Sequence, residues 1–235
     1  MTAGPSLSIV IPVLDEATTI VTALDALAPL RARGTEIIVV DGGSGDDTAA
    51  LARPLADFVI ASARGRATQM NAGAALARGD VLLFLHADTR LPDDADRLVL
   101  EGLARSKRAW GRFDVAIDGR HPLLPLVAAA MNRRSRLTGI ATGDQAMFVT
   151  REAFDSVGGF PEIALMEDIT LARNLKRVSR PLCLSARVTT SGRRWEQHGV
   201  LRTILLMWRL RLAYFFGARP EVLAKRYSGA PTDAA

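Results

Sequence analysis

The stretch that decides the fold is Val81-Leu82-Leu83-Phe84-Leu85-His86-Ala87-Asp88-Thr89. Its five apolar residues, preceded by Gly79-Asp80 and followed by polar residues, predict a strand buried on both faces within a parallel sheet. Such a strand delivers the residues after it to the carboxyl edge of the sheet, where open α/β folds bind their ligands. His86 and Asp88 follow here, and side chains two apart in an extended chain can both face one ion. The alternative is a turn in which Asp88 caps the next segment, and the short tripeptide does not decide between the two.

The composition indicates one domain with a sizeable core. The chain has 235 residues, 49% of them hydrophobic, and a net charge of +5, which together exclude a disordered protein. Its single cysteine excludes a disulfide framework and a cysteine-rich zinc site. The N-terminus has no signal-peptide pattern, and no apolar run reaches the length of about 18 residues that a membrane span needs. We therefore expect a cytoplasmic protein.

The positive charge comes almost wholly from arginine, since lysine occurs only at Lys107, Lys176 and Lys225. A basic balance can indicate a nucleic acid, a membrane surface or an anionic substrate as the partner. The chain has no basic run with interleaved aromatic residues and no recognisable nucleic-acid module. We therefore expect no nucleic-acid partner.

Strands alternate with helices along the first part of the chain. We expect strands at 7–13, 36–40, 58–60 and 81–85, with helices between them at 16–34, at 46–53 and from residue 64 onward. After Asp88 we expect helices at 92–107 and 167–178, strands at 110–118, 143–149 and 182–184, and a final amphipathic helix after Trp195. The segment 122–137 is helical or loop-like. This order predicts an α/β fold with one mixed, mostly parallel sheet flanked by helices.

Acidic residues follow three successive core strands, as Asp15-Glu16, Asp41 and Asp88. Each one alone could be a helix cap. Three at the same sheet edge suggest a pocket that recognises hydrogen-bond donors and holds a cation. Arg64 and Arg66 can add positive charge, and the balance fits a nucleotide diphosphate with a divalent metal. The chain lacks a P-loop and a G-x-S-x-G elbow, which argues against a P-loop kinase and against acyl transfer.

Seven motifs occur in an order that resembles the family 2 glycosyltransferases with the GT-A fold. They are Ser8-Ile-Val-Ile-Pro-Val-Leu-Asp-Glu16, Val39-Val-Asp-Gly-Gly-Ser44, 65–73, 84–89, Gly158-Gly-Phe160, Glu167-Asp168 and Arg194-Trp195. Within the family the chain is similar to small bacterial members known as radical-SAM/selenodomain-associated transferases. The resemblance implies a single domain over 1–235, with a nucleotide-binding half at 7–90, an acceptor half at 91–195 and a C-terminal helical segment at 196–235.

The resemblance also assigns donor-binding roles to residues of the first half. Pro12, Leu14 and Glu16 correspond to the first loop that contacts the nucleotide. Asp41 corresponds to the acid that hydrogen-bonds the base, and Arg66 to the basic residue over the nucleotide. Asp88 corresponds to the last acid of the D-x-D motif, the ligand of Mg²⁺ or Mn²⁺. His86 stands where the first acid of that motif usually is, which puts the metal affinity and the ribose contact in question.

The second half carries the remaining assignments. Asp168 corresponds to the general base of inverting members, although Glu167-Asp168 could instead favour the macrodipole of a helix start. Arg194 and Trp195 correspond to the end of a Q-x-x-R-W motif near the diphosphate and the acceptor. Ser191 replaces its glutamine, which argues against a processive synthase. Asp144 could orient a sugar or could belong to a turn.

The implied function is an inverting, metal-dependent, non-processive transfer of a sugar from a nucleotide-diphospho-sugar to an acceptor hydroxyl. UDP is the favoured nucleotide, GDP is the second candidate, and a lipid is one candidate acceptor. Two alternatives remain open at this point. One is a nucleotide-sugar-binding or scaffold module whose catalysis the change at His86 has impaired. The other is a sugar nucleotidyltransferase, although the acidic loop Leu14-Asp-Glu-Ala differs from the basic glycine-rich loop of that class.

The segment 200–216 carries an apolar stripe at helical spacing, made of Leu201, Ile204, Leu205, Trp208, Leu212 and Phe215. Arg202 and Arg209 lie together on another side. The stripe could close the acceptor side of the domain or form a homodimer interface. It could also lie in a membrane interface as a peripheral contact, with arginines that include Arg133, Arg134 and Arg136 attracted to anionic lipid.

Overall fold

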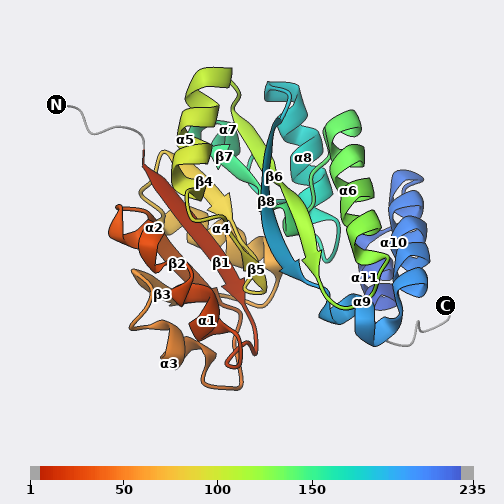
Figure 1. The fold of residues 1–235 in the computed structure, drawn as a ribbon, viewed down its shortest axis with the longest axis horizontal. Coiled ribbons are helices and arrows are strands. Elements are labelled where there is room, and N and C mark those ends of the chain that lie inside the picture. The colour runs from red at the N-terminus through yellow and green to blue at the C-terminus, as the bar shows by residue number, and fades with distance from the viewer. Residues whose placement is uncertain (1–5, 229–235) are drawn as a thin grey trace.

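The computed structural model describes residues 6–228, apart from the side chains of Arg194, His198 and Ser228. Its centre is an eight-stranded mixed sheet with the strand order β3-β2-β1-β4-β7-β6-β8-β5 (Figure 1). The strands are β1 (Leu7–Val13), β2 (Glu36–Asp41), β3 (Phe58–Ala61), β4 (Val81–Phe84), β5 (Thr89–Arg90), β6 (Trp110–Asp118), β7 (Phe148–Thr150) and β8 (Leu182–Ser191). The predicted fold class, a mixed sheet flanked by helices, is confirmed.

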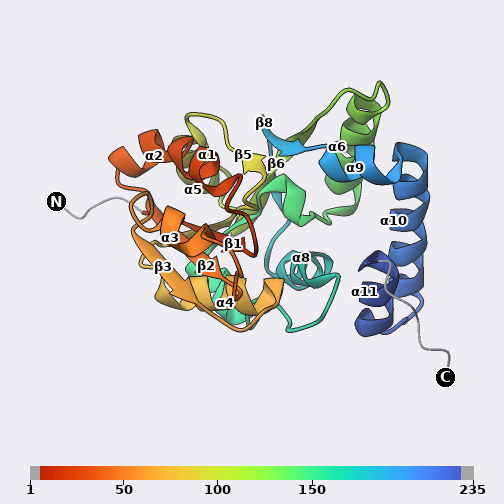
Figure 2. The same cartoon turned by 90° about the horizontal axis from the view of Figure 1, so that it is seen from below.

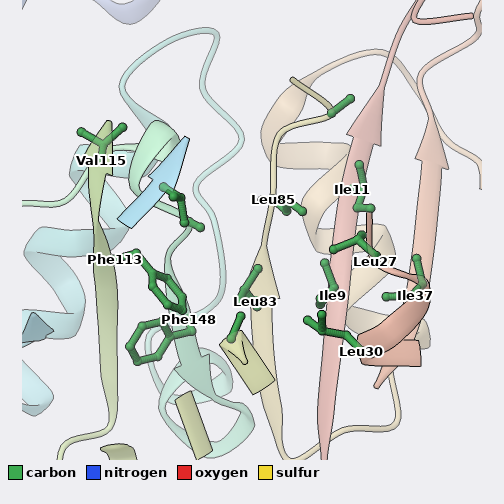
Figure 3. Packing of buried hydrophobic residues seen from close by; sticks show 14 of the residues in the cluster. Ile9, Ile11, Leu27, Leu30, Ile37, Leu83, Leu85, Phe113, Val115 and Phe148 are labelled. Atoms are coloured by element: carbon green, nitrogen blue, oxygen red, sulfur yellow. The ribbon is translucent and has the colours of Figure 1, made fainter. Parts of the chain in front are cut away.

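The first four strands pair in parallel, with β1 between β2 and β4 and with β3 beside β2. Their side chains alternate between two separate cores. Ile9, Ile11 and Leu83 belong to one core, while Val10 and Leu82 belong to the other (Figure 3 shows the first). Both faces are therefore covered, which explains the continuous apolar runs in the sequence.

Helices cover the two faces of the sheet unequally. The face of Ile9 packs against α1 (Ile20–Asp25), α2 (Ala28–Ala32), α3 (Thr48–Ala52), α5 (Ala95–Ser106) and α6 (Leu124–Thr138). The face of Val10 packs against α4 (Arg66–Leu76), α7 (Arg151–Ser156) and α8 (Glu167–Val178). On the face of Ile9, Leu27 and Leu30 pack against Ile9 and Ile37 (Figure 3). On the same face Phe113 packs against Phe148, with ring centroids 5.6 Å apart.

Two expected elements differ from the structure. The single helix expected at 16–34 is divided into α1 and α2, because Pro29 lies in the first turn of α2 and cannot donate to a preceding turn. The strand expected at 143–149 begins instead with the 3₁₀ turn η1 (Gly143–Gln145). Ala146 then adopts a left-handed conformation with φ 45°, and only the short β7 follows.

The sheet changes direction after β4, since β7 pairs antiparallel with both β4 and β6. Strand β8 then runs parallel to β6 over its full length, with an irregularity between Phe113 and Asp114. The long β8 extends well beyond the predicted 182–184. It carries the chain back to the edge at which the first strands end, where Thr89 and Arg90 pair with Thr190 and Thr189.

Three helices complete the described part of the chain: α9 (Arg193–His198), α10 (Val200–Phe215) and α11 (Pro220–Ser228). The final helix was not predicted. Helices α10 and α11 pack against each other and against the residues before α8 through Met166, Leu210 and Leu223 (Figure 2). The Tyr214 hydroxyl also hydrogen-bonds the Thr170 hydroxyl at 2.5 Å. Within 6–228, no helix is long and apolar enough to cross a membrane.

Candidate functional site

A cavity of about 400 Å³ lies at the carboxyl edge of the sheet. Three parts of the chain contribute to its wall. The first contributes Pro12, Glu16, Arg66, His86 and Asp88, and the second contributes Asp144, Glu167, Asp168 and Trp195. The C-terminal helices contribute Thr203, Met207, Arg211 and Tyr227. This is the edge at which the sequence predicted a site.

The loops after β1 and β2 are fastened together beside this cavity. The Ser44 hydroxyl bonds the Asp41 carboxylate and accepts the backbone N–H of Asp15 at 2.9 Å. The Asp15 carboxylate in turn accepts the N–H of Gly45 at 2.8 Å. Because the loops hold each other through these bonds, the chain around Pro12 and Glu16 has a fixed position.

Gln69 of α4 holds the ends of the same two strands from below. Its buried amide donates to the carbonyl oxygens of Val13 and Val40, each at 2.8 Å. Gly42 makes this possible, because a Cβ there would lie 2.9 Å from the Gln69 Oε1. The bonds also fix the start of α4, and with it the position of Arg66, the first residue of that helix.

His86 and Asp88 follow β4, and both line the cavity. The Asp88 residue is exposed, and its carboxylate accepts one hydrogen bond, from the Thr89 hydroxyl at 3.3 Å. The His86 Nδ1 lies 3.6 Å from an Asp144 carboxylate oxygen. The imidazole also packs against Gly143 so closely that a Cβ there would lie 2.5 Å from two of its ring atoms. His86 therefore contacts the η1 turn from the neighbouring strand, since β4 pairs with the strand β7 that follows η1.

The η1 turn is anchored by the buried side chain of Gln145. Its amide donates to the Ser135 hydroxyl at 3.1 Å and to Asn132 Oδ1 at 3.4 Å, both on α6. The Asn132 amide pairs with both backbone polar groups of Val115 in β6. The position of Asp144 is therefore set by contacts to distant segments, and these contacts are the reason that a strand was wrongly expected here.

Glu167 and Asp168 begin α8, as predicted, and both face the cavity. The loop before them is fixed by Asn71 of α4, whose amide exchanges two hydrogen bonds with the backbone of Phe160 at 2.8 and 2.9 Å. This pair joins two of the sequence motifs, 65–73 and Gly158-Gly-Phe160. Met166 then takes a left-handed conformation with φ 73°, a strained backbone for a residue with a side chain.

Asp168 is also bonded to the η1 turn, because its carboxylate accepts the backbone N–H of Gly143 at 2.9 Å. Burial raises the pKa of Asp168, and the charge of Asp144 raises it further, against the lowering effects of this bond and of Arg66. Burial likewise raises the pKa of Glu167, together with the negative charge of Asp168. The two carboxyl groups therefore hold protons more tightly than exposed carboxyl groups do.

The effects that lower the pKa of Asp144 outweigh the effect that raises it. Burial opposes its ionisation, but the hydrogen bond and charge of His86, together with Arg66 and Arg134, hold the pKa of Asp144 below its usual range. For Arg66, burial works against the charge, but Glu167, Asp144 and Asp168 raise its pKa. The site therefore combines one firmly ionised carboxylate with two carboxyl groups of raised pKa and a cluster of cations.

Arg134 of α6 is a charged residue beside this site that the sequence did not single out as part of it. Burial lowers its pKa, although Asp168 and Asp144 act to raise it. Its buried Nε and Nη2 have no hydrogen-bond partner within the described part of the chain. Arg193, Arg211 and Tyr227, which the sequence also did not assign to the site, line the cavity itself. No local signal distinguishes these residues, because only the tertiary structure brings them to the sheet edge.

The structure brings together nine of the predicted site residues in the lining of the cavity, namely Pro12, Glu16, Arg66, His86, Asp88, Asp144, Glu167, Asp168 and Trp195. Leu14 and Asp41 do not line it. Asp41 lies beside it at the end of β2, with its carboxylate occupied by the N–H and hydroxyl of Ser44. The side chain of Arg194 lies outside the described residues.

The residues present fit a divalent cation that is shared with a bound diphosphate. Among residues 6–228, no three His, Cys, Asp or Glu side chains are grouped as a metal site. Mg²⁺ and similar ions, however, are often held by one or two carboxylates, with phosphate oxygens and water as the other ligands. The exposed Asp88 carboxylate, facing the cavity with little internal bonding, is suited to that role.

Comparison with known proteins places this geometry in a family. The model of the family described as Glycosyl transferase family 2 matches residues 8–157, which is well over half of the chain. A PGL/p-HBAD biosynthesis glycosyltransferase of Mycobacterium tuberculosis is 38% identical over 96 residues, which cover 38% of each chain. A glucosyl-3-phosphoglycerate synthase of Mycolicibacterium paratuberculosis is 37% identical over 98 residues, covering 37% of this chain and 29% of that one. The matches thus span well under half the length of these relatives.

Solved structures resemble the fold at low sequence identity. A mannosyltransferase from Pyrobaculum calidifontis, in complex with GDP-Man and Mn²⁺, has a TM-score of 0.64 and 21% identity, covering 100% of this chain and 67% of that one. S. aureus TarS 1–349, in complex with UDP-GlcNAc, has a TM-score of 0.66 and 18% identity, covering 79% and 58%. These structures establish the likeness of the fold, with a mixed sheet of the GT-A type. The family match covers the strands that carry Glu16, Asp88 and Asp144 to the cavity, and the chain belongs to glycosyl transferase family 2.

Proposed function

We propose that the cavity binds a nucleotide-diphospho-sugar and that the protein transfers the sugar to an acceptor hydroxyl with inversion at the anomeric carbon. The observation that carries the proposal is that Asp88 and Asp168, eighty residues apart in the sequence, line the same cavity together with Arg66. A metal-binding carboxylate, a cation and a half-buried carboxyl group of raised pKa are the groups that a displacement at a sugar diphosphate needs.

In this proposal the donor lies across the carboxyl ends of β1, β2 and β4. Pro12 and Glu16 contact the nucleotide, with UDP favoured and GDP as the second candidate. Arg66 and Arg193 contribute positive charge to the cavity, which attracts and orients a diphosphate. Asp88 would hold Mg²⁺ or Mn²⁺. When bound, the ion would supply Lewis-acid stabilisation of negative charge on the diphosphate.

Asp168 acts as the general base. Its carboxylate takes the proton from the acceptor hydroxyl, whose oxygen forms the new bond to the anomeric carbon while the bond from that carbon to the diphosphate oxygen breaks. The Gly143 N–H holds one carboxylate oxygen of Asp168 in place. The raised pKa of Asp168 makes it a stronger base than an exposed aspartate. Asp144, fixed as an anion beside His86, is placed to accept hydrogen bonds from sugar hydroxyls.

Ser191, which stands where processive members have the glutamine of Q-x-x-R-W, supports a single transfer rather than processive synthesis. Thr203, Met207 and Arg211 line the α10 side of the cavity, and we assign them to the acceptor subsite. A lipid is one class of acceptor that this partly apolar wall would accommodate. The motifs His86-Ala-Asp88-Thr89 and Arg194-Trp195 support placing the chain among the small radical-SAM/selenodomain-associated members. We also treat the chain as a single GT-A domain.

The second candidate is a binding module without catalysis, which the histidine at position 86 favours. His86 pairs with Asp144 instead of adding a carboxylate beside Asp88. A donor would then bind without turnover.

The test is a thermal-shift screen with UDP-, GDP- and dTDP-sugars, each with and without Mn²⁺, followed by an assay of nucleoside diphosphate release with the selected donor. Binding to the folded state raises the melting temperature by mass action. We expect one nucleotide to stand out and Mn²⁺ to enlarge its effect. Release of nucleoside diphosphate supports the transferase, while binding without release supports the binding module. No shift with any donor would contradict both.

A further inference from the structure

Helix α10 has two opposite apolar faces, and only one of them is covered. Leu210 is buried against α8 and α11, together with the partly buried Leu206 and Met207. On the other side, large apolar side chains face solvent in a row at positions 201, 205, 208, 212 and 215. Their exposed fractions are 66% for Leu201, 58% for Leu205, 73% for Trp208, 59% for Leu212 and 79% for Phe215. We call these five residues the outer row.

The spacing of the outer row is that of one helix face, because its steps are four, three, four and three residues. Phe216 prolongs the row, with 76% of the residue exposed and its ring 5.5 Å from that of Phe215. Helix α10 lies at the outer margin of the molecule in both views (Figures 1 and 2). The row is therefore an apolar surface at an accessible edge of the protein.

Helix α10 itself carries charge of a single sign, and the acidic residues that flank it in the sequence are Glu196 and Glu221, the latter 3.6 Å from Arg219. Residues 197–220 contain no aspartate or glutamate and four arginines. Arg202 and Arg209 are exposed and lie beside the row. Each directly follows a row residue in the sequence, so it lies about 100° round the helix from that residue. A face of Leu, Trp and Phe bordered by arginines is typical of helices that lie in the interface of a membrane with anionic lipids.

From this we infer that α10 is a docking face for an anionic bilayer, with the outer row at the acyl boundary and Arg202 and Arg209 at the phosphates. A second copy of the chain fits the row less well. Standard protein interfaces use about 20–30 residues a side, and five side chains on one helix supply far fewer. The arginines of α10 on both copies would also oppose their approach.

The same helix borders the cavity. Thr203, Met207 and Arg211 line it, and Arg211 lies about 60° round the helix from Trp208, on the side away from Arg209. A bilayer against the outer row would therefore lie one helix width from the acceptor side of the cavity. The docking itself needs no donor and no turnover, so its test is independent of the proposed reaction.

The test is co-sedimentation of the full chain with vesicles of phosphatidylcholine, alone or with about 30% phosphatidylglycerol. The salt is about 50 or about 500 mM NaCl, at which the Debye length is roughly 14 or roughly 4 Å. We expect binding to the anionic vesicles at low salt and at least a tenfold loss at high salt. Replacing both arginines, as R202Q/R209Q, should lower the partition coefficient about 25-fold, since each surface arginine contributes about fivefold.

Matched variants test whether vesicle binding depends on the outer row or on exposed apolar side chains in general. L205Q/W208Q/L212Q should abolish vesicle binding, while L51Q/V178Q, which changes exposed apolar residues on α3 and at the end of α8, should leave it unchanged. Trp208 gives a probe that is read by comparison with W208F, because the buried Trp110 and the half-buried Trp195 are present in both proteins. We expect a blue shift of the emission with anionic vesicles that is absent in W208F.

Two results would overturn the inference. One is equal partitioning of the wild type and L205Q/W208Q/L212Q into anionic vesicles. The other is a wild type that binds neither vesicle type at low salt, and elution as a dimer that L205Q/W208Q/L212Q converts to a monomer would then assign the row to a second copy. Circular dichroism of each variant at the same concentration checks that the fold is retained, and a variant that loses its helical signal is replaced by the single change Trp208→Gln.

Discussion

At the scale of single residues, the two central carboxylates differ in their surroundings. Asp88 is exposed at the rim of the cavity, whereas Asp168 is held between Gly143, Glu167 and Asp144. A ligand for a cation needs open coordination positions, and a base needs a raised pKa. The surroundings of the two carboxylates therefore support the roles that we propose for them.

The Asp88→Ala variant tests the metal assignment. We expect it to remove most of the gain in donor affinity that Mn²⁺ gives to the wild type, because no other carboxylate occupies its place after β4. The measurement is titration calorimetry of the donor with Mn²⁺ and with EDTA. His86→Asp is the companion variant, and it should keep or strengthen the effect of Mn²⁺. Donor binding and turnover that EDTA leaves unchanged would show that the assignment is wrong.

The Asp168→Asn variant should change stability in a pH-dependent way. Because the folded state raises the pKa of Asp168, the carboxyl group favours folding at low pH, and this contribution is lost as the pH rises through the folded pKa. The asparagine has no such titration and still accepts the Gly143 N–H. The free energy of unfolding of the variant, relative to the wild type, should therefore increase between about pH 4, near the ordinary pKa of an aspartate, and pH 8.

Chemical denaturation at the two pH values measures this difference. Glu152→Gln on α7 is the control, since it removes an exposed carboxylate that does not line the cavity, and the gain with pH should be larger for Asp168→Asn than for this variant. A relative stability of Asp168→Asn that stays constant or falls with pH would contradict the raised pKa.

At the scale of elements, the sequence predicted what local patterns determine. The strands β1 to β4 were found because they are continuous apolar runs between turns, and α8 because two acids precede an amphipathic repeat. The η1 turn was not found, since its shape depends on Gln145 reaching Ser135 and on the left-handed Ala146. The same limit applies to Arg134, which belongs to the site only because α6 packs on β6.

Helix α4 shows how closely packing fixes an element of the site. A Cβ on Gly73 would lie 2.4 Å from Val10 Cγ1 and 2.9 Å from Val40 Cγ2. Both valines are in central strands and cannot move aside easily. We expect Gly73→Ala to lower the free energy of unfolding by about 1–3 kcal/mol through overpacking.

Gly102→Ala on α5 is the matched control for Gly73→Ala, because its closest contact, at 2.8 Å, is a terminal methyl group of Leu182, which can turn away. Alanine is also a better helix former than glycine, so Gly102→Ala should be close to neutral. Urea denaturation of both variants gives the comparison. An equal decrease in the free energy of unfolding of the two variants would mean that the destabilisation does not come from the close packing of α4 against β1 and β2.

At the scale of the whole molecule, the cavity is assembled from three separate segments. The part of the chain that holds the first four strands supplies Glu16, Arg66 and Asp88 from its loops and from α4. The middle of the chain supplies Asp144 and Asp168, and the C-terminal helices close the remaining side. The sequence located the first group and Asp168 through ordered motifs, whereas Asp144 lay outside the motifs and could have been a turn residue. It did not place Arg211 or Tyr227 at the site, since only the packing of α10 and α11 on the residues before α8 brings them there.

The account therefore depends on the two halves acting on one substrate, and one measurement tests this most directly. Release of nucleoside diphosphate from the selected sugar nucleotide is compared for the wild type and Asp168→Asn, with the dissociation constant of the donor determined for both. General-base catalysis contributes about 10²–10⁴-fold, so we predict at least a hundredfold slower release by the variant, with the donor affinity changed by less than about threefold. Release slowed by less than about tenfold would contradict the account and reduce Asp168 to a residue that stabilises the start of α8.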